Sequence, residues 1–263
     1  MSRQKLGQHF LHNSAWRARI AEMLPAARDV SWLEIGPGHG EMTEILAQRA
    51  NRLIAIETDA ALAQQLRERA SQWVNVEIVE ADVLTVDLHA LTQQRFRVYG
   101  NLPYYITSPI LRHLFACADQ IESIHVVVQW EVAQRIVARP HTRDYGYLSA
   151  LCQYYARPEI ALRIPPGAFS PPPKVFSALL AMPLPGHRAS LHIADDAAFL
   201  NFLQQCYAQK RKTLRNNLKA TDSDEALGKV FGAAGLSAHS RAEELTLAQF
   251  ADLFARLREP KAR

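Results

Sequence analysis

The sequence predicts an α/β fold, with a Rossmann-like parallel sheet followed by a small all-helical C-terminal domain. Two features of the chain lead to this prediction. A glycine turn, Gly36-Pro37-Gly38-His39-Gly40, joins the apolar run Trp32–Ile35 to a helical pattern. This is the order of strand, loop and helix with which doubly wound sheets hold nucleotide-like cofactors. Further apolar runs then alternate with helical segments, which is typical of parallel strands connected by helices.

Length and composition are compatible with this architecture and argue against two other classes of protein. The 263 residues, 48% of them apolar, are enough for one large domain and a small one. We expect a cofactor-binding catalytic domain at residues 1–184 and a helical domain at residues 185–263. No apolar run is long enough to cross a bilayer, and the N-terminus lacks the apolar stretch of a signal peptide. The sequence therefore predicts a cytoplasmic protein.

The cysteine pattern supports the same compartment. Cys117, Cys152 and Cys206 lie far apart in apolar helical patterns and form no C-x-x-C pair. This usage predicts buried thiols in a reducing environment, not disulfides or metal ligands. We accordingly expect no metal site.

The first helix is predicted at residues 41–49, because Met42, Ile45 and Leu46 share one face. In the turn before it, glycines permit positive φ and allow backbone N–H groups to approach a ligand. The spacing G-x-G-x-G, with an acidic residue two before the first glycine, differs from the G-x-G-x-x-G of pyrophosphate binders. By itself the turn is also compatible with an ordinary strand–helix connection.

Two acidic side chains after the next two strands favour a cofactor site. Glu57 ends the apolar run 53–56, at the offset of about 20 residues where an acid binds the ribose hydroxyls of an adenosine. Asp82 follows the run 76–80, where a carboxylate would accept from the amine of an adenine ring. Glycines and acids at the carboxyl ends of three successive strands together predict a cofactor that contains adenosine.

The fourth strand, residues 96–100, leads into Asn101-Leu102-Pro103-Tyr104. Pro103 biases Leu102 toward an extended conformation, which can turn its carbonyl outward, and Asn101 adds a side-chain carbonyl beside it. Two acceptors suit an adenine amine that gains positive character as it attacks a methyl group. Tyr104 offers a ring face for a flipped base. The alternative interpretation is a rigid turn capped by an aromatic residue.

The second half of the chain supplies the remaining strands and the helical domain. We expect a helix at 108–116, a strand at 124–129, helices at 132–138 and 147–155, and a strand pair at 157–164 and 175–182. The linker 165–173 is too proline-rich for regular structure; it is either a stiff spacer or a segment that presents Phe169 to the site. Amphipathic helices are predicted at 196–209, 213–219, 224–232 and 247–258.

Charge is distributed unevenly along the chain. Residues 29–131 carry 14 acidic and 7 basic side chains, whereas every flanking segment is net basic. An acidic body suits a cationic ligand such as a sulfonium, and basic flanks suit a polyanion. The run Lys210-Arg211-Lys212, with Arg215, is predicted to contact phosphates, although charge runs on helices are often only solvated surface.

With these motifs the chain resembles the S-adenosylmethionine-dependent rRNA adenine N6-dimethyltransferases over nearly its whole length. The residues that carry the resemblance are Gln8-His9-Phe10-Leu11, Glu34-Ile35-Gly36-Pro37-Gly38-His39-Gly40, Ile56-Glu57-Thr58-Asp59, Ala81-Asp82-Val83-Leu84, Gly100-Asn101-Leu102-Pro103-Tyr104, Phe169-Ser170-Pro171-Pro172-Pro173-Lys174-Val175-Phe176-Ser177 and Lys210-Arg211-Lys212-Thr213-Leu214-Arg215-Asn216-Asn217-Leu218. The last two look most like the branch that modifies the small ribosomal subunit. The chain departs from the usual family pattern at His9, His39 and Tyr105.

The resemblance implies a Rossmann-like methyltransferase sheet and a role for each matching residue. Gln8, His9 and Leu11 would close over the methionine end of S-adenosylmethionine. Gly36 and Gly38 would line the cofactor, Glu57 would bind its ribose, and Asp82 its adenine amine. Asn101 would serve cofactor and target alike. The target base would be held by Asn101, Leu102, Pro103 and Tyr104, with Phe169 as the second stacking face. From the charge distribution we expect Arg3 and Lys5 to join Lys210, Arg211, Lys212 and Arg215 in RNA binding.

The resemblance further implies the reaction. The enzyme would transfer methyl groups to N6 of two adjacent adenosines in the 3′-terminal hairpin loop of small-subunit rRNA, as a monomer acting on an immature subunit. Two alternatives stay open: an enzyme that methylates one adenine of large-subunit rRNA and confers antibiotic resistance, and a non-catalytic RNA-binding assembly factor. A nicotinamide oxidoreductase is disfavoured, because the glycine turn lacks G-x-G-x-x-G and no hydride site is visible.

Overall fold

A computed structural model describes residues 9–26, 30–219 and 223–258. The chain forms two compact units, one from residues 1–133 and 157–184 and the other from residues 134–156 and 185–263. The expected boundary near residue 184 therefore coincides with a change of unit. Residues 134–156, however, group with the C-terminal helices and not with the sheet, in contrast to the expected division into 1–184 and 185–263.

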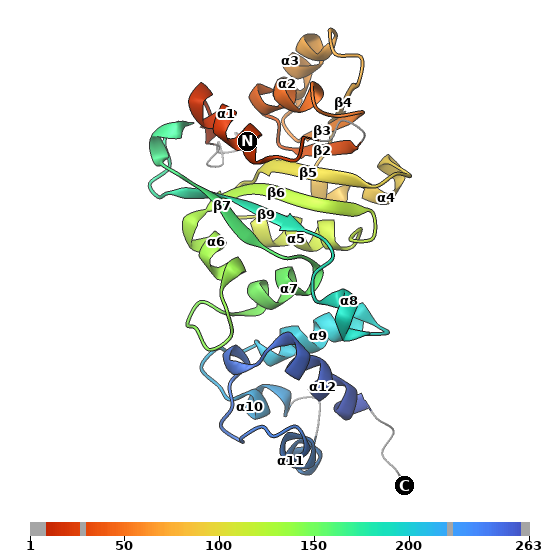
Figure 1. The fold of residues 1–263 in the computed structure, drawn as a ribbon, viewed down its shortest axis with the longest axis vertical. Helices are drawn as coiled ribbons and strands as arrows, with labels where there is room; N and C mark the ends of the chain where they lie inside the picture. Colours follow the sequence, from red (N-terminus) through yellow and green to blue (C-terminus); the bar gives the residue numbers. More distant parts are fainter. Residues whose placement is uncertain (1–8, 27–29, 220–222, 259–263) are drawn as a thin grey trace, which may run out of the picture. The chain divides into compact units, whose positions relative to one another are not determined.

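A seven-stranded sheet forms the first unit, in the order β4-β3-β2-β5-β6-β9-β7 (Figure 1). The strands are β2 (Ser31–Ile35), β3 (Leu53–Glu57), β4 (Val76–Glu80), β5 (Phe96–Asn101), β6 (Ile121–Gln129), β7 (Glu159–Ile164) and β9 (Ser177–Pro183). From β4 to β6 all neighbours are parallel, and β9 lies antiparallel between β6 and β7. The winding direction reverses between β2 and β5. In open α/β sheets, ligands bind at the carboxyl ends of the strands beside such a reversal.

The apolar runs of the sequence become the buried centre of this sheet. All five residues of β2 and of β3 are buried, as expected for parallel strands that are covered on both faces. Trp32, Leu53 and Tyr99 from three neighbouring strands join one core cluster with Leu46 and Leu179. The parallel sheet that the sequence predicts is therefore confirmed.

Helices connect the parallel strands. They are α2 (Glu41–Ala47), α3 (Ala60–Ala70), α4 (Leu88–Leu91), α5 (Thr107–Phe115) and α6 (Trp130–Val137), with α1 (Ser14–Met23) preceding the sheet and a 3-10 turn η1 (Val83–Thr85) after β4. Asp59 starts α3, because its side chain accepts from the N–H groups of Ala61 and Leu62. Neither α1 nor α3 is among the predicted helices.

The proline-rich linker is more regular than expected. It contains a 3-10 turn, η2 (Pro166–Ala168), and a short strand, β8 (Phe169–Ser170). This strand pairs antiparallel with β1 (Phe10–Leu11). The prediction of no regular structure is wrong for these residues, because Phe169 and Ser170 retain the N–H groups that proline lacks and lie opposite a partner segment.

The second unit is helical within its described residues. It contains α7 (Tyr147–Tyr155), α8 (Arg188–Leu191), α9 (Asp196–Cys206), α10 (Leu214–Leu218), α11 (Asp224–Ala233), a 3-10 turn η3 (Ala242–Glu244) and α12 (Leu247–Arg258). Its core is aromatic: the ring of Phe199 lies 5.1 Å from Tyr154 of α7 and 5.3 Å from Phe254 of α12, between ring centroids. The contact of Tyr154 with Phe199 explains why α7 belongs to this unit. Among the described residues, no helix is long and apolar enough to cross a membrane.

Candidate active site

A cavity of about 760 Å³, measured out to its open mouth, lies at the carboxyl ends of the strands beside the reversal. The predicted site residues that line it are His9, Gly36, Gly38, Glu57, Asp82, Asn101, Leu102, Pro103 and Tyr104. The fold thus brings residues from five separate sequence motifs to one place.

The glycine turn forms one wall of the cavity, and its conformation requires glycine. Gly36, Gly38 and Gly40 have φ values of +66°, +58° and +83°, in the left-handed region that side chains disfavour. At Gly38 a Cβ would also come within 2.9 Å of the Phe10 ring. The backbone of the turn is therefore held close to the cavity with no side chain in between.

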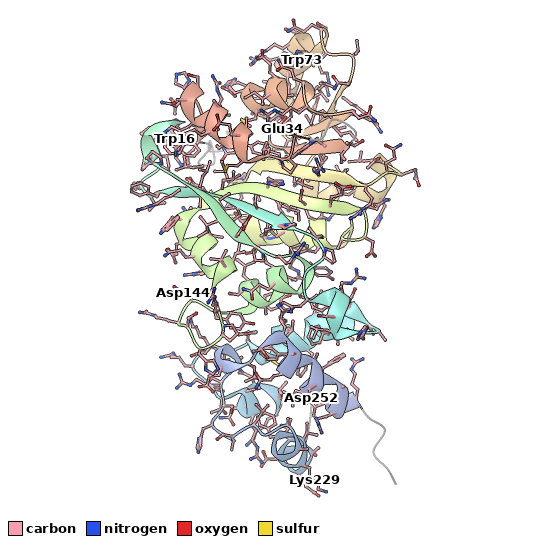
Figure 2. The ribbon with its side chains drawn as sticks, in the orientation of Figure 1. Trp16, Glu34, Trp73, Asp144, Lys229 and Asp252 are labelled. Atoms are coloured by element: carbon pink, nitrogen blue, oxygen red, sulfur yellow. The ribbon has the colours of Figure 1, made fainter. Side chains whose placement is uncertain are left out.

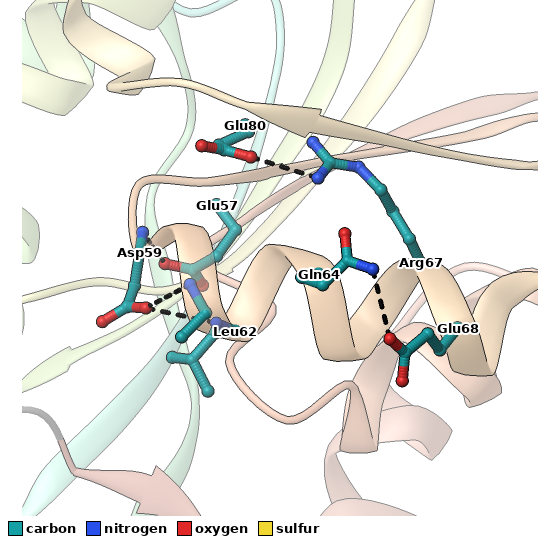
Figure 3. A network of polar contacts seen from close by, with 8 residues as sticks. Glu57, Asp59, Leu62, Gln64, Arg67, Glu68 and Glu80 are labelled. Atoms are coloured by element: carbon teal, nitrogen blue, oxygen red, sulfur yellow. Dashed lines mark hydrogen bonds and ion pairs between the residues drawn. The ribbon is translucent and has the colours of Figure 1, made fainter.

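Glu57 is fixed at the end of β3 by hydrogen bonds to both of its oxygens. Oε2 accepts from the N–H of Gly38 at 3.1 Å, and Oε1 accepts from the N–H of Asp59 at 3.0 Å. Figure 3 shows this carboxylate beside Asp59 at the start of α3. Because each carboxylate oxygen has two lone-pair positions, Glu57 retains acceptor capacity toward the cavity that it lines.

Asp82 occupies the corresponding place after β4. Its Oδ1 accepts from the N–H of Leu84 at 3.0 Å, so the side chain also begins the turn η1. The second carboxylate oxygen takes part in no hydrogen bond within the described part of the chain. Asp82 and Glu57 therefore present two acceptors to one cavity, at the ends of neighbouring strands.

The Asn101 side chain is oriented by a backbone group of the N-terminal segment. Its Nδ2 donates to the carbonyl oxygen of His9 at 2.8 Å, which leaves Oδ1 as an acceptor on the cavity wall. Leu102 is buried, and its N–H donates to the carbonyl of Val127 at 3.1 Å. The predicted pair of acceptors, Asn101 Oδ1 and the Leu102 carbonyl, lies on backbone that β5 and β6 hold in place.

Tyr104 and His9 connect the cavity to the proline-rich segment. The Tyr104 hydroxyl hydrogen-bonds the Ser177 hydroxyl at 2.9 Å, and burial raises the pKa of Tyr104. His9 lies 5.6 Å from Tyr104 between ring centroids, and its Nδ1 donates to the carbonyl of Pro171 at 2.7 Å. A carbonyl only accepts, so this bond requires the proton on Nδ1.

Two predicted site residues lie elsewhere. Leu11 and Phe169 face each other across the β1–β8 pair and belong to the core cluster, each with 5% of its surface exposed. Neither lines the large cavity. Phe169 therefore offers no stacking face there in this structure, because packing under β1 buries its ring. The predictions for Arg3, Lys5 and Gln8 fall outside the described residues.

The basic run lies in a turn before α10 and not on a helix. Lys210 donates to the carbonyl of Arg143 at 2.8 Å, and Arg215 pairs with Asp224 at 3.0 Å. Arg211 and Lys212 are exposed and form no ion pair with a described residue. Arg211 and Lys212 are therefore available to a ligand, whereas Lys210 and Arg215 support the fold of the unit.

Sequence reasoning missed the burial of Glu34, which is labelled in Figure 2. Glu34 is 1% exposed and lines a smaller cavity of about 320 Å³ together with Tyr99 and Asn101. Burial raises its pKa to about 8, and the negative charges of Glu41 and Glu57 act in the same direction. Within the described residues, neither Glu34 Oε2 nor the Tyr99 hydroxyl has a hydrogen-bond partner. The acid two residues before Gly36 was the available signal.

No group of three or more His, Cys, Asp or Glu side chains is arranged to hold a metal ion in the described parts of the chain. The three cysteines are free and buried. The large cavity therefore combines a glycine turn, two carboxylates, an amide and a tyrosine ring.

A family model for ribosomal RNA adenine dimethylase matches residues 1–259 of this chain. The chain belongs to this family. Its relative in Acidobacterium capsulatum, a ribosomal RNA small subunit methyltransferase A, is 47% identical over 258 residues, which are 97% of this chain and 91% of the relative. Members transfer methyl groups from S-adenosylmethionine, so this dimethylase is an enzyme that uses that cofactor.

Two solved structures are similar to this rRNA adenine dimethylase over most of the chain. The 23S rRNA methyltransferase ErmE has a TM-score of 0.68 and 28% identity, covering 94% of this chain and 99% of its own. A dimethyladenosine transferase from Plasmodium falciparum has a TM-score of 0.76 and 21% identity, covering 93% and 96%. The latter likeness is one of fold. The residues of the large cavity fit S-adenosylmethionine, because two carboxylate acceptors, Glu57 and Asp82, lie beside a glycine turn that admits a close ligand.

Proposed function

We propose that this rRNA adenine dimethylase transfers two methyl groups to N6 of each of two adjacent adenosines in the 3′-terminal hairpin loop of small-subunit rRNA. The product would be N6,N6-dimethyladenosine, made on the immature subunit during its biogenesis. The identity of 47% to a small subunit methyltransferase supports the choice of subunit. One observation supports the proposal most strongly: a single cavity is lined by Glu57, Asp82, Asn101, Leu102 and Tyr104.

The cofactor side of the cavity is assigned to the glycine turn and the two carboxylates. When bound, S-adenosylmethionine supplies a methyl group on a positively charged sulfur. Glu57 would accept from the ribose hydroxyls and Asp82 from the adenine amine, while Gly36 and Gly38 allow close approach. His9 and Asn101 would meet the methionine end. Gln8 would help to close over the methionine end. Leu11, which lies opposite Phe169 in the β1–β8 pair, would support the N-terminal segment.

The target side is assigned to Asn101, Leu102, Pro103 and Tyr104. An adenine amine becomes positively charged as it forms its new bond to carbon. Asn101 Oδ1 and the Leu102 carbonyl would stabilise that charge with fixed dipoles, and Pro103 would hold the Leu102 backbone extended. Stacking on Tyr104 would keep the flipped base in line for displacement. The proton leaves to water after the amine has become cationic, so no general base is required.

Removing either carboxylate should weaken cofactor binding. We expect Glu57→Ala and Asp82→Ala each to lose about 1 to 3 kcal/mol of S-adenosylmethionine affinity, the usual cost of leaving a buried hydrogen-bonding group without its partner. Isothermal titration calorimetry measures this directly. Glu80→Ala is the matched control, because Glu80 is an exposed acid on β4 that pairs with Arg67 at 3.1 Å and lies outside the cavity lining. Parent-like affinity in both site variants would remove the assignment.

The two predicted stacking residues should behave differently. Tyr104→Ala is expected to lose about 1 to 3 kcal/mol of RNA affinity, because it removes a base-stacking face. Its loss of stability should be smaller than that of Phe169→Ala, because the Tyr104 ring is only partly buried. Phe169→Ala should instead lower the free energy of unfolding by about 3 to 5 kcal/mol, the usual cost of deleting a buried phenylalanine ring. Binding to unmethylated small subunits and urea unfolding separate these effects. Undiminished RNA affinity of Tyr104→Ala would argue against a base stacked on that ring.

We propose that the helical unit binds phosphates of the RNA other than those at the target base. Arg211 and Lys212 would contact phosphates, assisted by Lys210, Arg215, Arg3 and Lys5. Charge reversal in Arg211→Glu/Lys212→Glu should weaken binding to small subunits and make its salt dependence shallower, by about one unit of slope per lost contact. Adenosine preference should persist at high enzyme concentration, since phosphate contacts carry no base identity.

Lys229→Glu provides the comparison for this charge reversal. Lys229, which is labelled in Figure 2, is an exposed cation on α11. It pairs with Glu225 at 2.7 Å. Its variant should keep the parent salt slope. If Arg211→Glu/Lys212→Glu also keeps the parent affinity and slope, the run is solvated surface only.

We further propose that the enzyme acts as a monomer in the cytoplasm. The free, buried state of Cys117, Cys152 and Cys206 supports a reducing compartment. Analytical ultracentrifugation tests the monomer.

A large-subunit enzyme is the alternative to test, because ErmE, a 23S rRNA methyltransferase, shares 28% identity and the fold. The 47% identity to a small subunit methyltransferase favours the small subunit over it. The discriminating experiment offers purified, unmethylated small and large subunits with methyl-labelled S-adenosylmethionine. Label in the small subunit is the expected result, and label in the large subunit alone would favour the alternative. RNA binding without label on either subunit would leave a non-catalytic assembly factor.

A further inference from the structure

A cation–π cluster lies at the same edge of the sheet as the large cavity. The Arg163 guanidinium is 4.0 Å from the ring centre of Phe176 and 4.9 Å from that of Trp130. We call these three residues the Arg163 platform. β6 is parallel to β5, and Trp130 follows its carboxyl end; Phe176 precedes β9, which runs antiparallel. Arg163, near the end of β7, therefore meets both rings at the carboxyl edge.

Two hydrogen bonds fix the Arg163 platform relative to the catalytic motif. The Trp130 N–H donates to the Phe176 carbonyl at 2.9 Å, which ties the two aromatic residues together. The next residue, Ser177, exchanges a hydrogen bond of 2.9 Å with the Tyr104 hydroxyl. Phe176 is thus one residue removed from a direct contact of the ring assigned to the target base.

Exposed apolar side chains concentrate around this point. Among the described residues, the large hydrophobic side chains with substantial exposure include Tyr105 at 61%, Val175 at 45% and Phe176 at 39%. All three lie within one or two residues of the bond between Tyr104 and Ser177. Exposed apolar groups in a cluster mark a contact surface, whereas single ones are ordinary.

The charge of the Arg163 platform is uncompensated. Arg163 is exposed and forms no ion pair with any residue that the structure describes, and the neighbouring Lys174 is exposed as well. Stacking occupies the faces of a guanidinium and leaves the N–H groups at its edge for an anion. An aromatic face beside such a cation is the combination that binds unpaired nucleotides, base on the ring and phosphate on the arginine.

We propose that the Arg163 platform binds an unpaired RNA nucleotide that flanks the target adenosine. Its base would stack on Phe176 and its phosphate would meet the Arg163 guanidinium. This inference rests on the proposed function in that the ligand is RNA. It adds a contact on the sheet unit, separate from Arg211 and Lys212, that holds the RNA next to the flipped base and sets which neighbour the target has.

Binding of unmethylated small subunits to the parent and three variants tests the proposal. Phe176→Ala should weaken RNA affinity roughly 5- to 150-fold, the equivalent of one lost base stack. Arg163→Lys keeps the charge but loses the planar fork, so affinity should fall while the salt slope stays that of the parent. Val74→Ala is the matched control, because Val74 is a fully exposed apolar residue between α3 and β4.

Three further readouts separate this role from a structural one. Cofactor affinity and thermal stability of Phe176→Ala should match the parent, and its loss in methyl transfer should fall on KM and not on kcat. Photo-crosslinking from p-benzoylphenylalanine at position 176 should reach a nucleotide in the same loop as the methylated adenosines. RNA affinity of Phe176→Ala equal to that of Val74→Ala, or a crosslink to a distant part of the RNA, overturns the proposal.

The result is distinguishable from a failure of the proposed function. If the parent methylates only large subunits, the choice of subunit is wrong, and the same comparison on large subunits still decides whether the Arg163 platform contacts a flanking nucleotide. If the parent methylates small subunits and Phe176→Ala binds them equally well, the function stands and the platform proposal falls.

Discussion

Replacing Glu34 by glutamine is expected to stabilise the cofactor-free protein by on the order of 3 kcal/mol at pH 7 and 4 kcal/mol at pH 8, with no gain near pH 4. The cause is the buried carboxyl, whose pKa rises to about 8 in the folded state from an ordinary value of 4.5. Above pH 4.5 the unfolded chain releases this proton while the folded chain keeps it. Folded-state stability is therefore full below pH 4.5 and declines as the pH rises through 8.

Urea unfolding between pH 4 and 8.5 measures this effect. Glutamine resembles the protonated acid in size and stays neutral, so the Glu34→Gln curve should lack the decline of the parent. Glu80→Gln is the control, since Glu80 is an exposed acid. Parallel curves for the parent and Glu34→Gln would mean that Glu34 is ionised in the folded protein, with a partner for its charge.

Replacing Asn101 by alanine is expected to slow methyl transfer about 100- to 1,000-fold, the usual cost of losing one preorganised group that stabilises transition-state charge. Two roles are proposed for this side chain. Its Nδ2 holds the His9 carbonyl at 2.8 Å, and its Oδ1 is the acceptor assigned to the target amine. Asn101→Asp keeps an acceptor oxygen and should retain more activity than alanine.

Single-turnover methyl transfer at saturating cofactor measures the chemical step of these variants. Calorimetry with S-adenosylmethionine shows how much of the loss comes from the N-terminal segment that Asn101 orients. A rate for Asn101→Ala within a few fold of the parent would exclude the side chain from the chemistry.

Much of the sheet was predictable because buried parallel strands have a simple signature. β3 is an apolar run that ends at Glu57, and β2 is apolar from Trp32 to Ile35 except for Glu34. The turn between β2 and α2 has glycines where φ is positive. Because the carboxyl ends of parallel strands lie at one edge of the sheet, the sequence alone predicts that Glu57, Asp82 and Asn101 lie close together there. Helix α3 was missed because charged and amide side chains surround its narrow buried face of Ala63, Leu66 and Ala70.

The remaining features depend on contacts between distant segments. Nothing local indicates that Phe10 and Leu11 pair with Ser170 and Phe169, or that this pairing buries the Phe169 ring. α7 belongs to the helical unit because Tyr154 contacts Phe199. The spacing of apolar residues predicts the two helices but not that they contact each other. The burial of Glu34 also depends on distant contacts. The sequence shows only an acid on a strand, whereas the packing shows that this acid is buried without a hydrogen-bond partner for Oε2 within the described residues.

Methyl transfer to two adjacent adenosines, from the cavity at the reversal of the sheet, can be tested directly. Unmethylated small subunits are incubated with the enzyme and S-adenosylmethionine, and modified nucleotides are then mapped by mass spectrometry. We expect N6,N6-dimethyladenosine at two adjacent positions of the 3′-terminal hairpin loop, and loss of both in Asn101→Ala. Methylation at a single adenine, at another atom, or undiminished in Asn101→Ala would contradict this expectation.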